Sequence, residues 1–432
     1  MQTPISLSDI SKYLGQEVSL KGWVTNFRSS GSIMFLQIRD GSGFVQAVVD
    51  KGAVGEKGWE EAQKVRIEAS VELVGIPKED PRSPWGYEVA VKEVKVLQAG
   101  EEFPIGKKEH GPDFLLDNRH MWIRSPRQWA ILRIRAGIYR LIQDWLDSHA
   151  FVRFDSPILT PNACEGTTSL FGVDYFDLCT AYLTQSGQLY LEAAIASLGK
   201  VYDFGPVFRA EKSKTRRHLN EFWMMDAEAA FVDYKGILEI EEQFVSFIVQ
   251  EIVKQYKIEL KILDRDLEPL KKIQAPFPRI THKEAVAKLH ELGSDIREDD
   301  DLGADDETIL TKLYDKPIFV EKYPAKVKAF YMKRDPEDAE RVLGADLLAP
   351  EGYGEIIGGS QREDDYEILK QRIIEHHLPL ESFQWYLDIR KYGSVPHSGF
   401  GVGLERLVAW ICKLDHVRET IPFPRLINRI TP

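Results

Sequence analysis

The sequence has few cysteines, no long apolar run and no excess of basic residues. Its three cysteines, Cys164, Cys179 and Cys412, are widely spaced and odd in number, which indicates reduced thiols and excludes a disulfide scaffold or a CxxC metal site. No apolar stretch approaches the roughly 20 residues that span a bilayer. The first residues, MQTPISLSDI, lack the basic and apolar regions of a signal peptide. We therefore expect a cytoplasmic protein that does not enter a membrane.

Acidic residues outnumber basic ones, with 68 Asp and Glu against 56 Lys and Arg and a formal net charge of −12. This balance argues against a protein that coats nucleic acid by bulk positive charge, although it still allows a local basic face. The Walker A loop, the HExxH motif and the GxGxxG fingerprint are also absent from the sequence. The 432 residues, 43% hydrophobic and 29% charged, predict two or three globular domains.

Residues 1–99 show the pattern of a small β-barrel. Short β-branched and apolar runs, separated by glycine-containing turns, predict five strands at 18–25, 33–39, 44–49, 65–76 and 87–97. A brief helical pattern at 59–64 falls between the third and fourth strands. This order is that of the OB fold, which binds oligonucleotides on one face, although any other small barrel would also fit the pattern.

Two side chains of this barrel favour binding of nucleic acid. Phe35, on the second strand, suits stacking against a base, and Gln46, on the third strand, suits reading a base edge. Lys21, Arg28 and Arg39 could supply contacts to phosphates. The alternative is that Phe35, like most phenylalanines in strands, belongs to the core.

A hinge separates the barrel from a larger region. Residues 100–117 (GEEFPIGKKEHGPDFLLD) are rich in proline, glycine and charge, which predicts a linker before a second domain at 118–432. Ser125, Pro126 and Gln128 form the start signal of a long helix: an N-cap, a proline at the first helical position and a capping-box glutamine.

The rest of the larger region alternates strands with occasional helices. Apolar residues at helical spacing predict an amphipathic helix at 237–256. Acidic residues dominate 291–307, which we interpret as a solvated loop within an insertion near 285–335.

The first cluster that carries chemistry is a strongly basic hairpin. The strand VFRAE at 207–211 is followed by the loop KSKTRRH and the return strand LNEF. Arg209, at the base of the hairpin, is placed to bind a phosphate through two parallel hydrogen bonds. Phe222, on the return strand, is placed to stack on a base. The alternative is a surface hairpin whose basic side chains are only solvated.

Two further clusters contain arginines and carboxylates. In GFGVGLER at 399–406, the alternate glycines let the backbone approach a ligand or another strand closely. Arg406 falls in the first turn of the next helix and opposes its dipole, so it needs either an anionic ligand or a core carboxylate as partner. In EIIGGSQRE at 355–363, Glu355 suits Mg²⁺ held through phosphate oxygens, and Arg362 suits reading a polar side chain.

Together these motifs resemble those of class II aminoacyl-tRNA synthetases. The stretch F-R-x-E at 208–211 is similar to motif 2, and G-L-E-R at 403–406 is similar to the end of motif 3. Motif 1, a helix and strand that end in a proline at the dimer interface, is identified at 138–157, with Pro157 as the proline. An OB-like barrel before the three motifs is similar to the arrangement in the aspartyl, asparaginyl and lysyl subgroup.

This resemblance covers nearly the whole chain and implies an α+β fold. It implies an N-terminal OB-fold β-barrel at 1–99 that binds the anticodon, followed by a class II catalytic domain whose antiparallel sheet is flanked by helices.

The segment LTQSGQLYLE at 183–192 separates the branches of the subgroup. Aspartyl enzymes carry Q-S-P-Q-L-x-K-Q here, and that lysine neutralises the side-chain carboxylate of the substrate. This sequence has Leu191 in place of the lysine and Glu192 after it, so aspartate would lose its charge partner. With WYLDIRKYGSVPHSGF at 385–400 and the basic hairpin loop, the sequence resembles the asparaginyl branch.

The resemblance implies a role for each matching residue. Around ATP it implies Arg209, Glu211, His218, Glu221, Phe222, Glu355 and Arg406, with Arg209, Glu211 and Arg406 as the catalytic residues. Around the amino acid it implies Glu165 and Gln188 on the α-amino group, Arg209 on the carboxylate and Arg362 on the side-chain carbonyl. For Mg²⁺ it implies Glu355, with Asp226 as a second candidate, and for the anticodon Phe35, Gln46 and Glu88.

The implied reaction joins asparagine to ATP as asparaginyl-adenylate and then transfers it to the 3′-terminal ribose of tRNA(Asn), in a homodimer. Selectivity against aspartate is expected from Arg362, from Leu191 and from acidic surroundings that include Glu221. The alternatives are an aspartyl enzyme of relaxed specificity, an asparagine-forming paralogue and a pure RNA-binding module.

Two departures from the family pattern are PRLIN at 424–428, where P-R-T-P-G is usual, and Gly358, where aspartyl relatives have serine.

Overall fold

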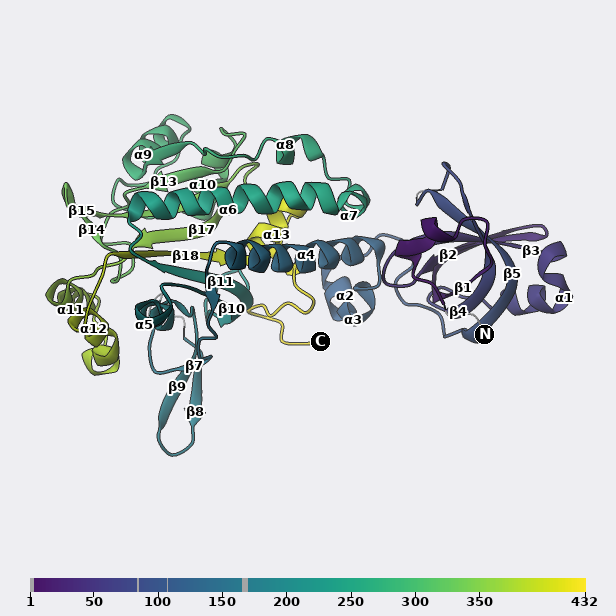
Figure 1. The fold of residues 1–432 in the computed structure, drawn as a ribbon, viewed down its shortest axis with the longest axis horizontal. Coiled ribbons are helices and arrows are strands. Elements are labelled where there is room, and N and C mark those ends of the chain that lie inside the picture. Colours follow the sequence, from purple (N-terminus) through teal and green to yellow (C-terminus); the bar gives the residue numbers. More distant parts are fainter. Residues whose placement is uncertain (1–3, 84, 107, 165–169) are drawn as a thin grey trace. The chain divides into compact units, whose positions relative to one another are not determined.

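The computed structural model describes residues 4–83, 85–106, 108–164 and 170–432 (Figure 1). Its contacts divide the chain into two compact units, Met1–Ser125 and Pro126–Pro432. The division follows two short helices, α2 (Pro112–Asp117) and α3 (Arg119–Trp122), and the domain boundaries expected at residues 99 and 117 stay predictions. Within the described part of the chain, no helix combines the length and the apolar character needed to cross a membrane.

The first unit contains a closed five-stranded barrel in the order β1-β2-β3-β5-β4. A short 3-10 helix at Leu7–Tyr13 precedes its elements, which are β1 (Val18–Ser30), β2 (Ile33–Arg39), β3 (Phe44–Asp50), α1 (Lys51–Ala62), β4 (Ser70–Glu79) and β5 (Tyr87–Gln98). The predicted OB-like barrel, with five strands and a helix after the third, is confirmed.

Three boundaries in the barrel differ from the prediction by five residues or more, the first being that of β1, which ends at residue 30 instead of 25. The helix begins at residue 51 instead of 59 because the carboxylate of Asp50 caps it, accepting hydrogen bonds from the backbone N–H groups of Gly52 and Ala53. The fourth strand begins at residue 70 instead of 65, after a turn in which Glu68 has a φ of 65°. Val65 lies before the strand but is buried, and its apolar side chain explains why the sequence predicted a strand from this residue.

The second unit is built on an eight-stranded sheet in the order β12-β13-β16-β17-β18-β11-β10-β6. Its strands are β6 (Val152–Arg153), β10 (Lys200–Phe208), β11 (Glu221–Ala230), β12 (Arg279–Thr281), β13 (Ile318–Glu321), β16 (Gly344–Ala349), β17 (Gly354–Gln361) and β18 (His397–Gly403). The five strands from β16 to β10 pair antiparallel. Smaller sheets contain β7 (Leu159–Thr160), β8 (Gly172–Tyr175) and β9 (Cys179–Leu183), and β14 (Arg334–Asp335) and β15 (Asp338–Val342).

Two long helices, α4 (Pro126–Ser148) and α6 (Tyr234–Gln255), lie side by side against this sheet (Figure 1). Phe244 of α6 has no exposure, and its ring contacts those of Trp145 on α4 and Phe400 on β18. The other helices are α5 (Gln188–Leu198), α7 (Lys257–Ile262), α8 (Leu267–Lys271), α9 (His282–Glu291), α10 (Ala304–Thr311), α11 (Tyr366–Glu375), α12 (Gln384–Lys391) and α13 (Leu404–Cys412), with 3-10 helices at Leu380–Phe383 and Val417–Glu419. The expected α+β fold with a sheet flanked by helices is confirmed, although the sheet is mixed: its centre is antiparallel, and the edge pairs β12–β13 and β10–β6 are parallel.

The acidic segment 291–307 is more than the solvated loop that we expected. Ile296 and Leu302 are buried in an apolar cluster with Leu289 of α9 and Leu310 of α10. The segment ends inside α10, which begins at residue 304. The segment therefore contributes to a small apolar cluster, which also includes Leu348 of the main sheet.

Candidate active site

Alternate side chains of strand β11 point to the apolar core on one face of the sheet and to the candidate site on the other face. Met225 and Ala227 are fully buried in the core, so the alternation of a strand directs Phe222, Asp226 and Glu228 to the other face. This strand returns from the predicted basic hairpin, and its pairing with β10 is antiparallel, as expected.

A row of paired residues crosses the sheet on this face. Asp346 on β16 pairs with Gly358, Gly358 with Gly401 on β18, and Gly401 with Asp226. Because the two glycines have no side chains, the surface of the sheet between the two carboxylates is bare backbone. A Cβ atom on Gly401 would lie only 2.7 Å from Oδ1 of Asp226, which explains why this position is a glycine.

Five of the residues predicted around ATP line one pocket: Arg209, His218, Phe222, Glu355 and Arg406. The Arg209 guanidinium lies over the Phe222 ring, 5.5 Å from its centre. The Nε atom of Arg209 is buried and has no hydrogen-bond partner among the described residues, which costs free energy unless a ligand accepts from it. Burial and the charge of Arg406 lower the pKa of His218, so its imidazole is neutral at pH 7. The pocket thus suits an anion beside an aromatic ring.

Arg406 has a carboxylate partner, which is one of the two alternatives that its sequence position suggested. It lies in the first turn of α13 and lines the pocket, and its Nη1 is 2.6 Å from Oε2 of Glu355. Burial by itself would raise the pKa of Glu355, but Arg406 and Lys328 outweigh it and the pKa is lowered. Glu355 is therefore an ionised carboxylate within the pocket.

The carboxylate that accompanies Glu355 is Asp346, which no sequence motif marks. Oε1 of Glu355 and Oδ1 of Asp346 lie 3.3 and 3.7 Å from the place that a Cβ of Gly358 would occupy. Asp226 lies two strands from β17, about 10 Å away at the usual strand spacing, and its Oδ2 accepts a hydrogen bond from Ser186. The structure therefore does not bring the predicted pair of Glu355 and Asp226 together, but places Asp346 where Asp226 was expected.

Residues of the acidic insertion form ion pairs with residues in and beside the pocket. Lys328 lies with its Nζ 2.7 Å from Oδ2 of Asp346 and 3.3 Å from Oδ1 of Asp301 in the insertion. Glu307 of α10 accepts a hydrogen bond of 2.6 Å from Nη1 of Arg217 in the basic hairpin loop. Burial raises the pKa of Asp346 to about 6 and that of Glu307 to about 7.

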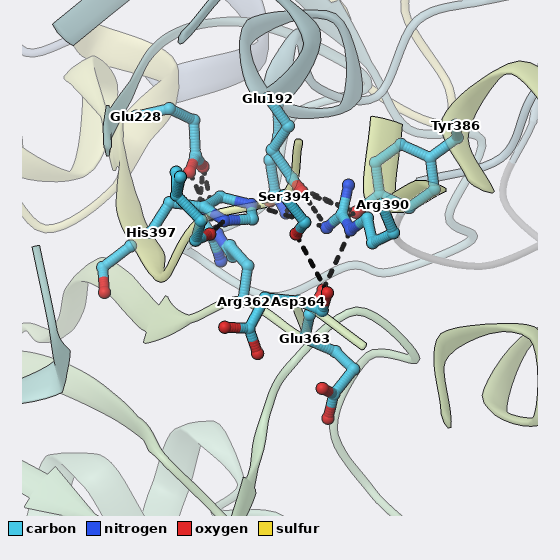
Figure 2. Close-up of polar contacts among 12 residues, drawn as sticks. Glu192, Glu228, Arg362, Glu363, Asp364, Tyr386, Arg390, Ser394 and His397 are labelled. Carbon is cyan, nitrogen blue, oxygen red and sulfur yellow. Dashed lines mark hydrogen bonds and ion pairs between the residues drawn. The ribbon is translucent and has the colours of Figure 1, made fainter. Parts of the chain in front are cut away.

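Arg362 and Glu228 form a buried pair at another part of the same face (Figure 2). Nε and Nη2 of Arg362 donate to Oε1 of Glu228 at 3.0 and 2.5 Å, and Nη1 donates to the hydroxyl of Ser360 at 2.6 Å. Burial raises the pKa of Glu228 to about 7, although the charge of Arg362 opposes the shift. Sequence reasoning found Arg362 but missed Glu228, because only the pairing of β11, β18 and β17 brings the two together. The one available signal was its even spacing from Phe222 and Asp226 along the strand.

Glu211 and Glu221 line a second, outer cavity, together with residues 425–430 of the C-terminal tail. Glu221 stands seven residues from Glu228 on the same strand, which is about 23 Å. The expectation that Glu221 belongs to the acidic surroundings of the substrate side chain is therefore wrong. The acidic group beside Arg362 is Glu228.

The predicted residues around the α-amino group are found only in part. Gln188 is the first residue of α5 and donates a hydrogen bond to Glu192, whereas Glu165 lies outside the described residues. Leu191 is fully buried in an apolar cluster with Ile195, so the side chain that replaces a lysine packs among hydrophobic residues.

The three predicted anticodon residues lie on neighbouring strands of the barrel. Leu36 is fully buried, so its neighbour Phe35 faces outward, and the alternative of a core phenylalanine is excluded. The guanidinium of Arg28 lies 4.4 Å from the centre of the Phe35 ring. Gln46 and Glu88 are paired residues on β3 and β5, and the Gln46 amide donates to the Glu88 carboxylate at 3.4 Å.

One expected phosphate contact on the barrel is wrong. Arg39 is only 7% exposed, and its Nη2 lies 2.8 Å from Oε2 of Glu68, so its guanidinium is already paired inside the unit. Lys21, in contrast, keeps an exposed side chain.

Comparisons with known proteins agree with this geometry. An OB-fold nucleic acid binding domain matches residues 18–97, and the family described as tRNA synthetases class II (D, K and N) matches residues 111–427. The asparagine–tRNA ligases of Desulforamulus reducens and Pelotomaculum thermopropionicum are 54% and 52% identical to this chain, over 98% and 99% of both sequences. The chain belongs to the asparagine–tRNA ligase family.

The solved structures place this member of the asparagine–tRNA ligase family in the same branch. The asparaginyl-tRNA synthetase from Pyrococcus horikoshii, complexed with asparaginyl-adenylate, is 48% identical over 100% of both chains, with a TM-score of 0.95. The aspartyl-tRNA synthetase from Entamoeba histolytica is 27% identical, with a TM-score of 0.83. The resemblance to the asparaginyl branch is therefore confirmed.

The close packing of Glu228 against β18 can be tested with a single methyl group. A Cβ atom on Gly399 would lie 2.0 Å from Oε1 of Glu228 and 2.4 Å from the backbone oxygen of Ala227. We predict that Gly399→Ala displaces Glu228 from Arg362 and raises the KM for asparagine about tenfold or more. ATP–pyrophosphate exchange measures this constant. Gly205→Ala on β10, where a Cβ would meet nothing within 4 Å, is the matched control, and an unchanged KM in Gly399→Ala would contradict the packing.

Proposed function

We propose that this site carries out both steps of the asparagine–tRNA ligase reaction. In the first step, an α-carboxylate oxygen of asparagine attacks the α-phosphorus of ATP, the bond to pyrophosphate breaks, and asparaginyl-adenylate forms. In the second step, the 3′-hydroxyl of the terminal tRNA ribose attacks the activated carbonyl and AMP leaves. The observation that carries the proposal is the spacing of Phe222 and Glu228 on one face of β11, about 20 Å, which suits adenine at one end and an amino-acid side chain at the other.

The arginines of the pocket supply the charge that the polyphosphate needs. Arg209 binds the α-phosphate and the substrate carboxylate, Arg406 binds the γ-phosphate, and Phe222 stacks on adenine. Support comes from the buried free Nε of Arg209 and from its position over the Phe222 ring. Neither step needs a nucleophile from the protein, so catalysis consists of positioning and charge neutralisation.

Of the other four residues expected around ATP, only His218 and Glu355 line the same pocket. His218 lines the same pocket as a neutral imidazole, while Glu211 and Glu221 lie in the outer cavity next to it. We assign these two glutamates to the approach of the tRNA end, beside the basic loop. Glu165 and Gln188 keep their expected role at the α-amino group of asparagine as predictions from the resemblance.

Mg²⁺ fits the carboxylates on β16 and β17. Asp346 and Glu355 flank Gly358, and carboxylate oxygens are the donors that Mg²⁺ shares with phosphate groups. Asp226 lies apart from them and is bonded to Ser186, so we assign it to the floor of the site rather than to the metal. When bound, the ion neutralises phosphate charge.

Selectivity for asparagine follows from the Arg362–Glu228 pair. Arg362 donates to the side-chain carbonyl of asparagine, and ionised Glu228 accepts from its amide nitrogen. The carboxylate of aspartate would instead meet a second carboxylate in a buried place, and an unpaired buried charge costs several kcal/mol. The geometry thus favours asparagine without an editing step.

We further propose that the protein binds tRNA(Asn), forms a homodimer and acts in the cytoplasm. On the barrel, Phe35, Gln46 and Glu88 recognise the anticodon of tRNA(Asn). Exposed apolar residues around the motif 1 proline, with Val152 44% and Ile158 43% exposed, support a homodimer. None of the three cysteines, all of which lie in the described residues, forms a disulfide, which supports the reducing cytoplasm as the place of action.

The central assay is asparagine-dependent ATP–pyrophosphate exchange. We expect Arg209→Ala and Arg406→Ala to lower exchange about a hundredfold or more, because each removes a charge partner of the polyphosphate. Arg334→Ala, which removes an arginine from a partly exposed ion pair with Glu375, is the control. Thermal melting verifies the fold, and a folded variant that keeps its exchange rate would remove that arginine from the site.

The raised pKa of Glu228 predicts a pH-dependent selectivity. Below about pH 7 the carboxyl group is neutral and its O–H can donate to the carboxylate of aspartate, whereas above that pH it is an anion that repels aspartate. The ratio of kcat/KM for asparagine to that for aspartate should therefore rise from pH 6 to pH 8. In Glu228→Gln the ratio should be low and flat over this range. A flat ratio in the parent protein would contradict the assignment of Glu228.

If Phe35 binds the anticodon, its loss should affect aminoacylation of tRNA but not the formation of the adenylate. We expect Phe35→Ala to lower the rate of tRNA aminoacylation about tenfold to a hundredfold through loss of a base stack, while pyrophosphate exchange without tRNA stays normal. Leu97→Ala, another exposed apolar residue of the barrel, controls for the loss of surface. If exchange falls in parallel with charging, Phe35 supports the structure instead.

A further inference from the structure

Glu192 lies at the centre of a buried network beside the Arg362–Glu228 pair (Figure 2). Its carboxylate has no exposure and accepts hydrogen bonds from four side chains. The donors are Nε2 of Gln188 at 3.0 Å, the hydroxyl of Tyr386 at 2.8 Å, Nε2 of His397 at 3.0 Å and Nη2 of Arg390. Glu192 therefore joins α5, α12 and the first residue of β18.

The charge state of this carboxylate follows from its neighbours. Nδ1 of His397 lies 2.8 Å from the carbonyl oxygen of Val395, and Nε2 faces Glu192. Arg390 is always protonated and can only donate, so its Nη2 at the carboxylate of Glu192 requires an acceptor there. Burial by itself would raise the pKa of Glu192, but Arg390 and His397 outweigh it and the pKa is lowered. Glu192 is thus an anion that can only accept.

The negative charge of Glu192 determines which end of the Gln188 amide, NH₂ or oxygen, faces it. Gln188 and Glu192 stand four residues apart on α5, so their side chains meet on one face of the helix. A carboxylate requires a donor, so the NH₂ group of Gln188 faces Glu192 and its Oε1 faces the opposite way. Gln188 is 5% exposed, so the amide has little room to turn.

We propose that Glu192 is a positioning residue of the asparagine site, which holds the Gln188 amide so that Oε1 faces the α-ammonium group of the substrate. This inference rests on the proposed role of Gln188 at that group. The competing explanation is a structural ion pair that only joins α5 to α12. Buried ion pairs seldom stabilise a fold more than apolar packing does, so stability alone does not account for four donors on one carboxylate.

The decisive variant is Glu192→Gln, which keeps the size of the side chain but can present either an acceptor or a donor to Gln188. We expect the KM for asparagine in pyrophosphate exchange to rise about tenfold or more, while the KM for ATP and kcat stay close to those of the parent protein. Inhibition by succinamic acid, which is asparagine without its α-amino group, should keep the same inhibition constant because it has no ammonium group to lose.

Two further variants keep the test falsifiable. Tyr386→Phe removes one donor from the same carboxylate and leaves the contact between Gln188 and Glu192, so the KM for asparagine should stay within about threefold of the parent value. Gln188→Met should raise this KM as Glu192→Gln does, and the double variant should lose little more than either single variant. Thermal melting verifies the fold of each protein.

The outcomes separate this inference from the proposed function. Equal weakening of asparagine and succinamic acid in Glu192→Gln, or a loss in Tyr386→Phe as large as that in Glu192→Gln, would overturn the positioning role and leave a structural pair. A raised KM in Gln188→Met with a normal KM in Glu192→Gln would overturn this inference and keep the role of Gln188. An unchanged KM in Gln188→Met would overturn the proposed role of Gln188 itself.

Discussion

The antiparallel pairing of β11 with β18 decides where the functional side chains of this protein lie. Glu228 pairs with Gly399 and Asp226 with Gly401, so each carboxylate faces a residue without a side chain. A Cβ atom at either glycine would overlap the carboxylate opposite. A shift of the pairing by one residue would turn Glu228 into the apolar core, because strand side chains alternate between the two faces. The site therefore depends on one register.

The same face collects charges that a protein interior normally avoids. Arg406 pairs with Glu355, Arg362 with Glu228, and Arg390 with Glu192. Each charge of the last two pairs, which are almost completely buried, costs several kcal/mol of desolvation, which its partner offsets only in good geometry. Anions such as the phosphates of ATP and a substrate carboxylate can then bind to arginines that are already held in place, so little reorganisation is needed during the reaction.

The acidic insertion supports the phosphate pocket, because it lies beside the basic hairpin loop and beside Asp346. The small apolar cluster holds α10 against the sheet, and Glu307 on that helix binds Arg217 of the basic hairpin loop. Asp301 of the same insertion lies near Lys328, which pairs with Asp346. A segment that looks like a solvated surface in the sequence therefore supports the loop and the carboxylates around the phosphate pocket.

The sequence by itself determined the class of the fold, the order of barrel and catalytic region, a helix that begins at residue 126, a second helix at 237–256, and the charged residues within the short motifs. These features depend on local patterns: strand alternation, helix start signals and short runs such as FRAE and GLER. Arg209, Phe222 and Arg406 could be named because each lies inside such a run, and the structure brings all three to one pocket.

Only the tertiary structure decided which distant carboxylate meets which cation. Glu228 and Arg362 are 134 residues apart, and Glu192 and Arg390 are 198 residues apart. No local pattern links them, because their meeting depends on strand order and on the packing of α5 against α12. For the same reason the sequence misplaced Glu221 and Asp226 and gave no sign of Asp346. Spacing along a strand fixes the face on which a side chain lies, but only pairing across strands fixes what it touches.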